Sequence, residues 1–474
     1  MPTFGSDRPQ KRFPGIIVLV AVVLAVLIGG AYYLAPRLER EAPQVALKPD
    51  TDVLGRAPLE IAVTDVGTGL KSVTVTLAAG GTDRTLASEQ YAEPAKEKRF
   101  ALDLSKLGGV KEGPAVLRVS ARDASLWKFF GGNETVFEKS LTIDITPPTL
   151  ALVADDRYIT FGGAGAIVYK PSPDTVTSGV RIGEYFFPGF PGQVKGQPDH
   201  YLAFFAHPYN VPTSAKAVLV ATDKAGNTRE MPLVYELRGA KYRKSTLAIS
   251  DSFIQTKVAP LLNDVGARQG SLQEVFIAVN RRLRKENEDR ITAITKKATP
   301  SILWSGAFVQ LSNSKVEANF ADERTYTFNN ATIDTAYHLG YDLSVTRQYP
   351  VEAANSGTVA FVGDLGIYGN TVILDHGLGL YTLYAHLSSI DVKEGESIRQ
   401  RQILGRTGET GLAAGDHLHY GVYLHGVAVL PVEWWDEKWI NDNIRPKLEG
   451  LSGEAIAEMQ QPKAPRKAAQ KRRR

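Results

Sequence analysis

The sequence predicts a mainly β protein made of one apolar N-terminal helix, two β-sandwiches, a helical linker and a C-terminal antiparallel β domain. Three observations support this fold class. An uncharged apolar run lies near the start of the chain. Short alternating segments separated by Gly, Asp and Pro follow it, as is typical of sandwiches. Six of the eight histidines then gather between His338 and His425, in a strand-rich segment punctuated by glycine.

The apolar run covers residues 15–35, which are 21 residues without a charge. As a helix it would be ~31 Å long, about the thickness of one hydrocarbon core. Arg8, Lys11 and Arg12 put the positive excess before the run, so residues 1–14 are expected in the cytoplasm. A cleaved signal peptide is the alternative, but the run exceeds the usual apolar core of ~7–15 residues. We therefore predict an uncleaved single-pass anchor in the cytoplasmic membrane, with the body in the periplasm or extracytoplasmic space.

Residues 46–146 are predicted to form the first sandwich and residues 147–238 the second. The boundary is the Thr146-Pro147-Pro148 break, because two prolines cannot continue a central strand. The strands expected in the first sandwich are 59–66, 72–77, 99–104, 115–122 and 136–145. Those expected in the second are 166–169, 201–206, 217–221 and 232–237.

The two sandwiches contain a repeated strand end. Residues 119–123 (VSARD) and 219–223 (LVATD) lie one hundred residues apart, and the second copy continues into the turn DKAGN at 223–227. Asp, Gly and Asn tolerate the positive φ that such turns need. The pattern resembles tandem bacterial immunoglobulin-like domains. That resemblance implies spacing or binding rather than chemistry.

Residues 239–300 change to a helical pattern and are predicted to be a linker. Ser271 and Glu274 form a capping-box pattern, and apolar residues recur at helical spacing from Leu272 to Leu283. The basic residues between 281 and 285 are expected to lie on a solvated helix face.

Four of the six histidines in residues 301–445 occur in three short motifs. His338 and Asp342 flank Gly340, His386 ends an alternating strand, and His417 and His419 are two residues apart. Positions i and i+2 of a strand point to one face, so the last pair should converge. Imidazole and carboxylate are good zinc ligands, and a catalytic zinc needs three of them plus an open position. The chain has no cysteine, which excludes thiolate metal sites, disulfides and cysteine nucleophiles.

These motifs, His-x-Gly-x-Asp, then Tyr-x-His-Leu, then His-x-His, resemble the lysostaphin-like (LytM-type) family of zinc peptidoglycan endopeptidases. The strand at 372–377 and the glycine-rich turns at 392–396 and 404–408 resemble that family too. The resemblance covers residues 327–435 and implies a C-terminal metallopeptidase domain. Tyr341 departs from the Ile or Val usual in the family, which affects packing rather than ligation.

The resemblance implies a role for each matching residue. His338, Asp342 and His419 would bind one zinc ion per chain, and His386 and His417 would be the catalytic pair, with their individual roles left open. His376 is expected to make a structural hydrogen bond, and His425 to lie on the surface. The implied reaction is hydrolysis of amide bonds in the peptide part of peptidoglycan. A D-Ala–diaminopimelate cross-link and a glycine bridge both fit.

Two other function classes stay open at this point. Some relatives have lost the ligands and act as binding or activating modules for other cell-wall hydrolases. The sandwiches alone would also suit a structural or adhesive envelope protein, although the five-residue constellation would then have no use. Zinc content would separate the first alternative from an enzyme.

The formal charge of +4 is unevenly distributed. Residues 1–14 contribute +2 and residues 461–474 contribute +7, which leaves a body of −5. Residues 446–474 are expected to be a disordered basic tail. Its charged end, residues 461–474, would either only keep the chain soluble or contact anionic wall or membrane polymers, a contact that ionic strength should weaken. A nucleic-acid partner is disfavoured, because this tail would lie outside the cytoplasm.

Overall fold

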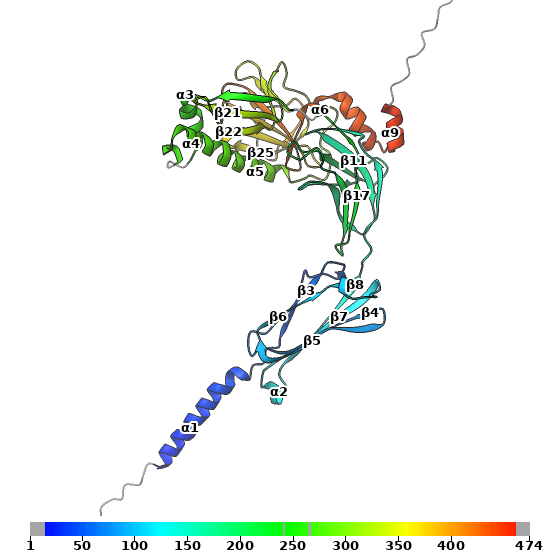
Figure 1. The fold of residues 1–474 in the computed structure, drawn as a ribbon, viewed down its shortest axis with the longest axis vertical. Helices are drawn as coiled ribbons and strands as arrows, with labels where there is room; N and C mark the ends of the chain where they lie inside the picture. The colour runs from blue at the N-terminus through cyan, green and yellow to red at the C-terminus, as the bar shows by residue number, and fades with distance from the viewer. Residues whose placement is uncertain (1–14, 240–241, 264–266, 461–474) are drawn as a thin grey trace, which may run out of the picture. The chain divides into compact units, whose positions relative to one another are not determined.

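The computed structural model describes residues 15–239, 242–263 and 267–460. The basic segments 1–14 and 461–474 lie outside them. The chain divides into two compact units, residues 1–147 with 223–227, and residues 148–222 with 228–474. The structure is mainly β, as the sequence predicts (Figure 1).

The first unit begins with helix α1 (Gly15–Leu34), followed by a 3-10 turn at Ala35–Arg37. Among the described residues one helical stretch, Ile17–Arg37, is long and apolar enough to cross a membrane. Its side chains are exposed, because the rest of the unit does not cover them. This is the state expected of a helix that has lipid as its solvent.

The rest of the first unit is two sheets packed on one core. The smaller sheet has strand order β1-β3-β6 (Gln44–Lys48, Leu59–Thr64, Glu97–Leu102). The larger has order β2-β8-β7-β4-β5 (Val53–Leu54, Glu134–Ile143, Gly113–Asp123, Leu70–Ala79, Thr82–Ala95). Alternate residues of both sheets, such as Ile61 and Val75, point into a shared apolar core. The predicted strands are all present, and β1, β2 and β5 are additional.

The second unit opens with another pair of four-stranded sheets. One has order β14-β15-β11-β9 (Phe190–Pro191, Tyr201–Ala206, Ala164–Pro171, Leu150–Ala154). The other has order β13-β12-β16-β17 (Tyr185–Pro188, Thr175–Ile182, Val218–Asp223, Thr228–Pro232). The predicted strand 232–237 was wrong. Residues 233–235 are not in a strand, and β18 (Glu236–Arg238) pairs instead with β10 (Tyr158–Thr160) in a separate sheet.

Residues 239–300 are more than a helical linker. Ser271 caps α4 (Leu272–Ile277) through the predicted capping box, and the helix continues through a π-helical segment (Ala278–Leu283) into α5 (Arg284–Thr295). Before it, however, β19 (Lys244–Ala248) joins a sheet with β21 (Asp322–Phe328) and β22 (Ala331–His338). Helix α3 (Asp251–Phe253) and a π-helical segment at Ile254–Val258 follow β19. This region therefore packs on the C-terminal domain.

The C-terminal domain is built on an eight-stranded antiparallel sheet. Its order is β20-β23-β31-β27-β26-β25-β29, with β32 added on β31; the strands are Lys315–Ala318, Tyr341–Ser344, Leu418–Leu424, Leu380–Ala385, Asn370–Asp375, Gly357–Asp364, Ser397–Ile398 and Val427–Val429. A small sheet, β24-β30-β28 (Pro350–Glu352, Ile403–Arg406, Ser389–Ile390), packs beside it. Every residue of β27 and β31 is buried, including the polar side chains of Thr382 and His419.

Short helices close the chain, and they correct the prediction for residues 446–474. Helices α6 (Pro431–Trp435) and α7 (Glu437–Trp439) lead through a π-helical segment at Ile440–Ile444 into α8 (Arg445–Leu448) and α9 (Gly453–Gln460). Lys447 is fully buried and forms an ion pair with Asp156 of the preceding sandwich. Residues up to 460 are thus part of the folded unit rather than of a disordered tail.

Candidate functional site

The site lies where β22, β23 and β31 end beside one another. His338 is the last residue of β22, Asp342 is the second residue of β23, and His419 is the second residue of β31. Asp342 and His419 are directly opposite in the antiparallel pair of β23 and β31, so their side chains lie on one face. The turn through Gly340 brings His338 to the same place.

Gly340 is required for this close approach. A Cβ atom at this position would lie 2.6 Å from the carbonyl oxygen of Tyr420 and 2.7 Å from the ring of His419. No ordinary side chain tolerates such distances, so glycine is the residue that lets the turn lie against the ring. The glycine of the His-x-Gly-x-Asp motif thus has a steric explanation.

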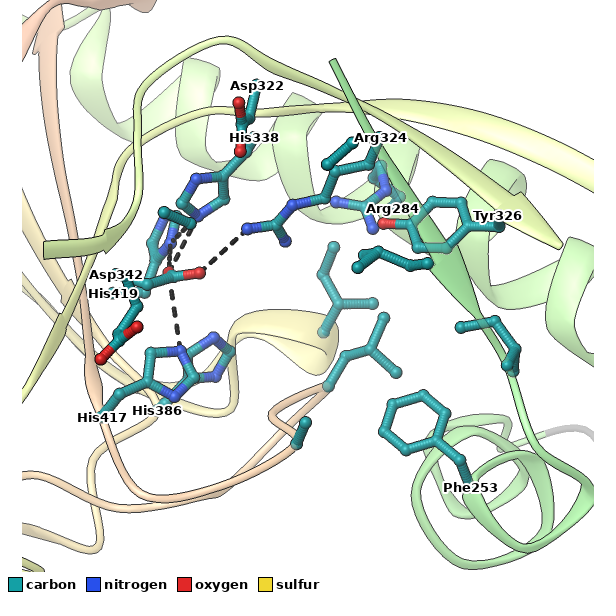
Figure 2. Close-up of a pocket in the computed structure, with 18 of the residues that line it drawn as sticks. Phe253, Arg284, Asp322, Arg324, Tyr326, His338, Asp342, His386, His417 and His419 are labelled. Atoms are coloured by element: carbon teal, nitrogen blue, oxygen red, sulfur yellow. Dashed lines mark hydrogen bonds and ion pairs between the residues drawn. The ribbon is translucent and has the colours of Figure 1, made fainter. Parts of the chain in front are cut away.

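Three ligand atoms converge within hydrogen-bond distance. Asp342 Oδ1 lies 2.9 Å from His338 Nε2 and 3.0 Å from His419 Nδ1, and these two nitrogens are 2.9 Å apart (Figure 2). All three side chains are largely buried, with 16% of the Asp342 side chain exposed. Burial alone would raise the pKa of Asp342, but the adjacent His338, His417 and His419 lower it well below its usual value.

A hydrogen bond to a backbone carbonyl fixes where the proton of His338 is. His338 Nδ1 is 2.9 Å from the Asn319 carbonyl oxygen, which only accepts, so Nδ1 carries the proton and Nε2 presents a lone pair. His419 Nε2 is buried without a hydrogen-bond partner among the described residues. With the proton on that nitrogen, His419 Nδ1 also presents a lone pair. Two nitrogen lone pairs and a carboxylate oxygen then face one another. These electron-rich atoms repel each other, and a bound cation would remove that repulsion.

This donor set fits a zinc ion. Two neutral imidazoles and one carboxylate are among the ligand combinations that zinc accepts, and His338 is held by a backbone carbonyl as metal-binding histidines usually are. His338, Asp342 and His419 also form the group of possible ligand atoms that lie within 4.8 Å of one another here. These residues could therefore hold one metal ion.

His386 and His417 lie on the open side of this cluster. The Nδ1 of His386 donates to the Thr410 carbonyl and the Nδ1 of His417 to the Gly415 carbonyl, each at 2.8 Å. Both Nε2 atoms are therefore free to face the site. The two ring centroids are 4.8 Å apart, and His417 Nε2 lies 3.5 Å from Asp342 Oδ1.

The environments of these two histidines differ. Burial, with the neighbouring His417 and His419, lowers the pKa of His386 well below its usual value, so its imidazole is neutral near pH 7. His386 also adopts a left-handed backbone with φ of 62°, which is uncommon for a non-glycine residue. For His417, burial lowers the pKa, but the Asp342 carboxylate outweighs burial and the net shift is upward.

Arg324 is a site residue that the sequence did not indicate. It lies on β21, and its Nη2 is 3.0 Å from Asp342 Oδ2. Arg324 thus occupies one carboxylate oxygen and leaves Oδ1 for the histidines (Figure 2). No motif surrounds it in the sequence, because it reaches the site only through the pairing of β21 with β22.

The cluster is at the end of a cavity of about 510 Å³. The far wall comes from the region predicted to be a linker, including Leu247 of β19, Phe253 of α3 and Phe276 of α4. Arg284, expected on a solvated helix face, also lines the cavity and bonds Asn280. The segment 239–300 thus supplies part of the site.

The two remaining histidines of the cluster are structural. His376 is fully buried between the Ser356 carbonyl and the Thr382 hydroxyl, at 2.7 Å each, and burial lowers its pKa to about 4. Its predicted structural role is therefore confirmed. The surface position predicted for His425 was wrong, because it is 7% exposed and stacks on Phe190 with ring centroids 5.9 Å apart.

Comparison with known proteins gives a family match in this region. Residues 336–431 match the family described as Peptidase family M23. DD-carboxypeptidase/endopeptidase Mpg of Neisseria meningitidis serogroup B is 41% identical over 95 residues, which are 20% of this chain and 22% of that protein. Peptidoglycan DD-endopeptidase ShyA of Vibrio cholerae serotype O1 is 33% identical over 112 residues, 24% of this chain and 25% of that protein. The chain thus matches about a quarter or less of the length of these relatives.

Among solved structures, the catalytic domain of the antimicrobial peptidase lysostaphin from Staphylococcus simulans is similar. It is 27% identical, the match covers 26% of this chain and 92% of that chain, and the TM-score is 0.22.

Proposed function

Residues 336–431 are a Peptidase family M23 domain, and from this premise we propose that the chain is a zinc-dependent endopeptidase that hydrolyses amide bonds in the peptide part of peptidoglycan. His338, Asp342 and His419 would bind the metal, and His386 and His417 would be the catalytic pair. The observation that carries the proposal is the convergence of two imidazole nitrogens and one carboxylate oxygen within 3.0 Å of one another, with two further imidazoles beside them.

A zinc ion held there would supply Lewis acidity toward the scissile carbonyl. The other parts of the mechanism belong to the protein. The Asn319 carbonyl and Arg324 orient His338 and Asp342, so that the ligand atoms are in place before substrate arrives. The walls of the cavity hold the peptide beside the histidines and exclude part of the solvent.

His386 and His417 are placed to move protons during hydrolysis. Each is oriented by a backbone carbonyl at Nδ1, which leaves Nε2 for the reacting atoms. A neutral imidazole accepts the proton of the attacking water, and the resulting imidazolium returns it to the leaving amine. One of the two histidines would serve in this way, while the other would donate a hydrogen bond to the developing oxyanion.

The substrate we favour is the DD cross-link of peptidoglycan rather than a glycine bridge. Two relatives are named DD-carboxypeptidase/endopeptidase and peptidoglycan DD-endopeptidase, and they are similar to this chain over 95 and 112 residues. We also propose that α1 anchors the chain in the cytoplasmic membrane, with the N-terminus inside and both sandwiches, of immunoglobulin-like type, outside with the peptidase domain.

The decisive experiment is release of muropeptides from defined peptidoglycans by the full chain in detergent, analysed by mass spectrometry. Wild-type protein should contain one zinc per chain and release products of DD cleavage. His338→Ala should lose zinc and activity, whereas His417→Ala should keep zinc and lose activity. Unchanged release in both variants would refute the mechanism. Zinc-free wild-type protein that binds peptidoglycan without cleaving it would instead support a silent binding or activating module.

A further inference from the structure

The loop between β7 and β8 of the first unit is longer than its fold requires. Asp123 closes the loop by accepting from the Asn133 backbone N–H and side-chain amide, at 2.7 and 2.8 Å. At the end of β16 of the second sandwich, Asp223 makes the same two contacts with Asn227, at 2.9 and 3.0 Å. In the second sandwich the two bonded residues are four positions apart, whereas in the first sandwich they are ten positions apart. The extra residues of the first loop, here called the insertion, are therefore not needed for these hydrogen bonds.

The insertion ends in exposed aromatic residues held in an unusual conformation. Phe129 is 99% exposed and Phe130 is 71% exposed, and neither contributes to the core of the sandwich. Lys128, Phe129 and Phe130 have φ of 53°, 55° and 69°, so α2 (Trp127–Phe130) contains a left-handed turn. Such values are rare for bulky residues, and they keep both rings away from the domain.

The base of this loop is bonded to the chain directly after α1. The Leu126 N–H donates to the Arg37 carbonyl at 2.7 Å, and the Ser125 hydroxyl donates to the Glu39 carbonyl at 2.7 Å. The Arg40 guanidinium lies over the Trp127 ring, 4.1 Å from its centroid. Figure 1 shows α2 at the end of the first sandwich from which α1 leaves.

The distances place the loop at the depth of the lipid headgroups, provided that α1 spans the membrane. Arg37 is the third residue after the end of α1, so at ~2 Å per residue of 3-10 helix it lies ~6 Å beyond Leu34. The headgroup layer on each side of a bilayer is about 5–7 Å thick. A loop bonded to Arg37 therefore begins within or at the edge of that layer.

We propose that the Trp127-Lys128-Phe129-Phe130 loop inserts into the outer interface of the bilayer that α1 crosses, as a second membrane attachment. The chemistry is that of interfacial segments, because aromatic rings partition into the headgroup boundary and a lysine meets lipid phosphates. The proposal rests on the proposed anchor. Its consequence is that the first sandwich is held at two points, which restricts its rotation about the end of the helix.

The absence of cysteine in the chain makes a direct test possible. Phe129→Cys and, separately, Phe130→Cys are labelled with an environment-sensitive fluorophore in the full chain. The control is Thr82→Cys, an exposed position at the start of β5, which is ~30 Å from the insertion at ~3.3 Å per strand residue. Each protein is reconstituted in vesicles of phosphatidylethanolamine and phosphatidylglycerol, with and without a phospholipid that carries a nitroxide near its headgroup.

We expect both loop probes to emit at shorter wavelength and to be quenched by the nitroxide lipid about threefold or more over the Thr82→Cys probe. Equal quenching at all three positions, in protein that floats with the vesicles, would overturn the loop proposal and leave the anchor intact. A blue shift without lipid quenching would indicate contact with a second copy or another protein, and would also overturn it. If the protein does not float with the vesicles, both the proposed anchor and the loop proposal that rests on it are overturned.

Discussion

Glu433 offers a quantitative test of how the C-terminal domain is joined to the preceding sandwich. It lies on α6, is 7% exposed, and accepts a hydrogen bond from the Ala164 N–H of β11 at 2.8 Å. A Cβ atom on Gly163 would lie 2.5 Å from its carboxylate oxygens, so the two elements approach closely. Burial raises the pKa of Glu433 from 4.5 to about 7, against the hydrogen bonds from Thr160 and Ala164 that lower it.

The sign and size of the effect follow from this shift. Between pH ~4.5 and ~7 the folded chain keeps a proton on Glu433 that the unfolded chain has lost, so stability falls as the pH rises. At 1.36 kcal/mol per pKa unit, this carboxyl group makes the free energy of unfolding about 3 kcal/mol higher below pH ~4.5 than above pH ~7. Glu433→Gln cannot ionise, so the variant should gain about 3 kcal/mol relative to wild type between pH ~5 and ~8.

Urea unfolding followed by tryptophan fluorescence measures this difference. Four of the five tryptophans, at 304, 434, 435 and 439, lie in the second unit, so the signal reports mainly on it. Burial also lowers the pKa of His376 and of His425 to about 4, which costs stability below pH ~6.5, but this loss occurs in both proteins and cancels. Stability curves of wild type and Glu433→Gln that stay parallel from pH ~5 to ~8 would refute the reasoning.

Three further predictions concern the metal site. Arg324→Ala should weaken zinc affinity by about 10–100-fold in chelator competition, because Asp342 loses the group that orients it; unchanged affinity would argue against that role. His386→Ala and His417→Ala should each keep zinc and lower kcat by about 10²–10⁴-fold, since proton transfer is lost; zinc loss in either would make it a ligand instead. Gly340→Ala should reduce zinc content measured by atomic emission, because its Cβ meets the His419 ring; full occupancy would contradict the steric argument.

Much of the fold could be predicted because the signals were local. Strand alternation located the sandwich strands, and 201–206 matches β15 (Tyr201–Ala206) residue for residue. The capping box at Ser271 and Glu274 formed as expected. The five site residues also came together: Asp342 and His419 are opposite each other on paired strands, His386 directly follows the neighbouring strand β27, and the short turn through Gly340 brings in His338 from β22.

The errors arose where the partner of a segment lies far away in the chain. The alternation at 232–237 cannot reveal that β17 and β18 join different sheets. Arg324 reaches Asp342 only through a hairpin, and β19 reaches β21 through a parallel pairing. His425 was expected at the surface because its own segment does not show that Phe190 of the sandwich covers it.

The wall that Leu247, Phe253 and Phe276 build opposite the histidine cluster affects how such a protein can diversify. The proposed metal ligands lie on β22, β23 and β31, whereas this wall comes from a segment upstream of residues 336–431, which match the M23 family. Substitutions in the wall can change which peptide is accommodated without altering a single ligand. Asn319 and Arg324, which orient two of the proposed ligands, also lie upstream of residue 336, so transplanting residues 336–431 alone would leave behind both this wall and these orienting groups.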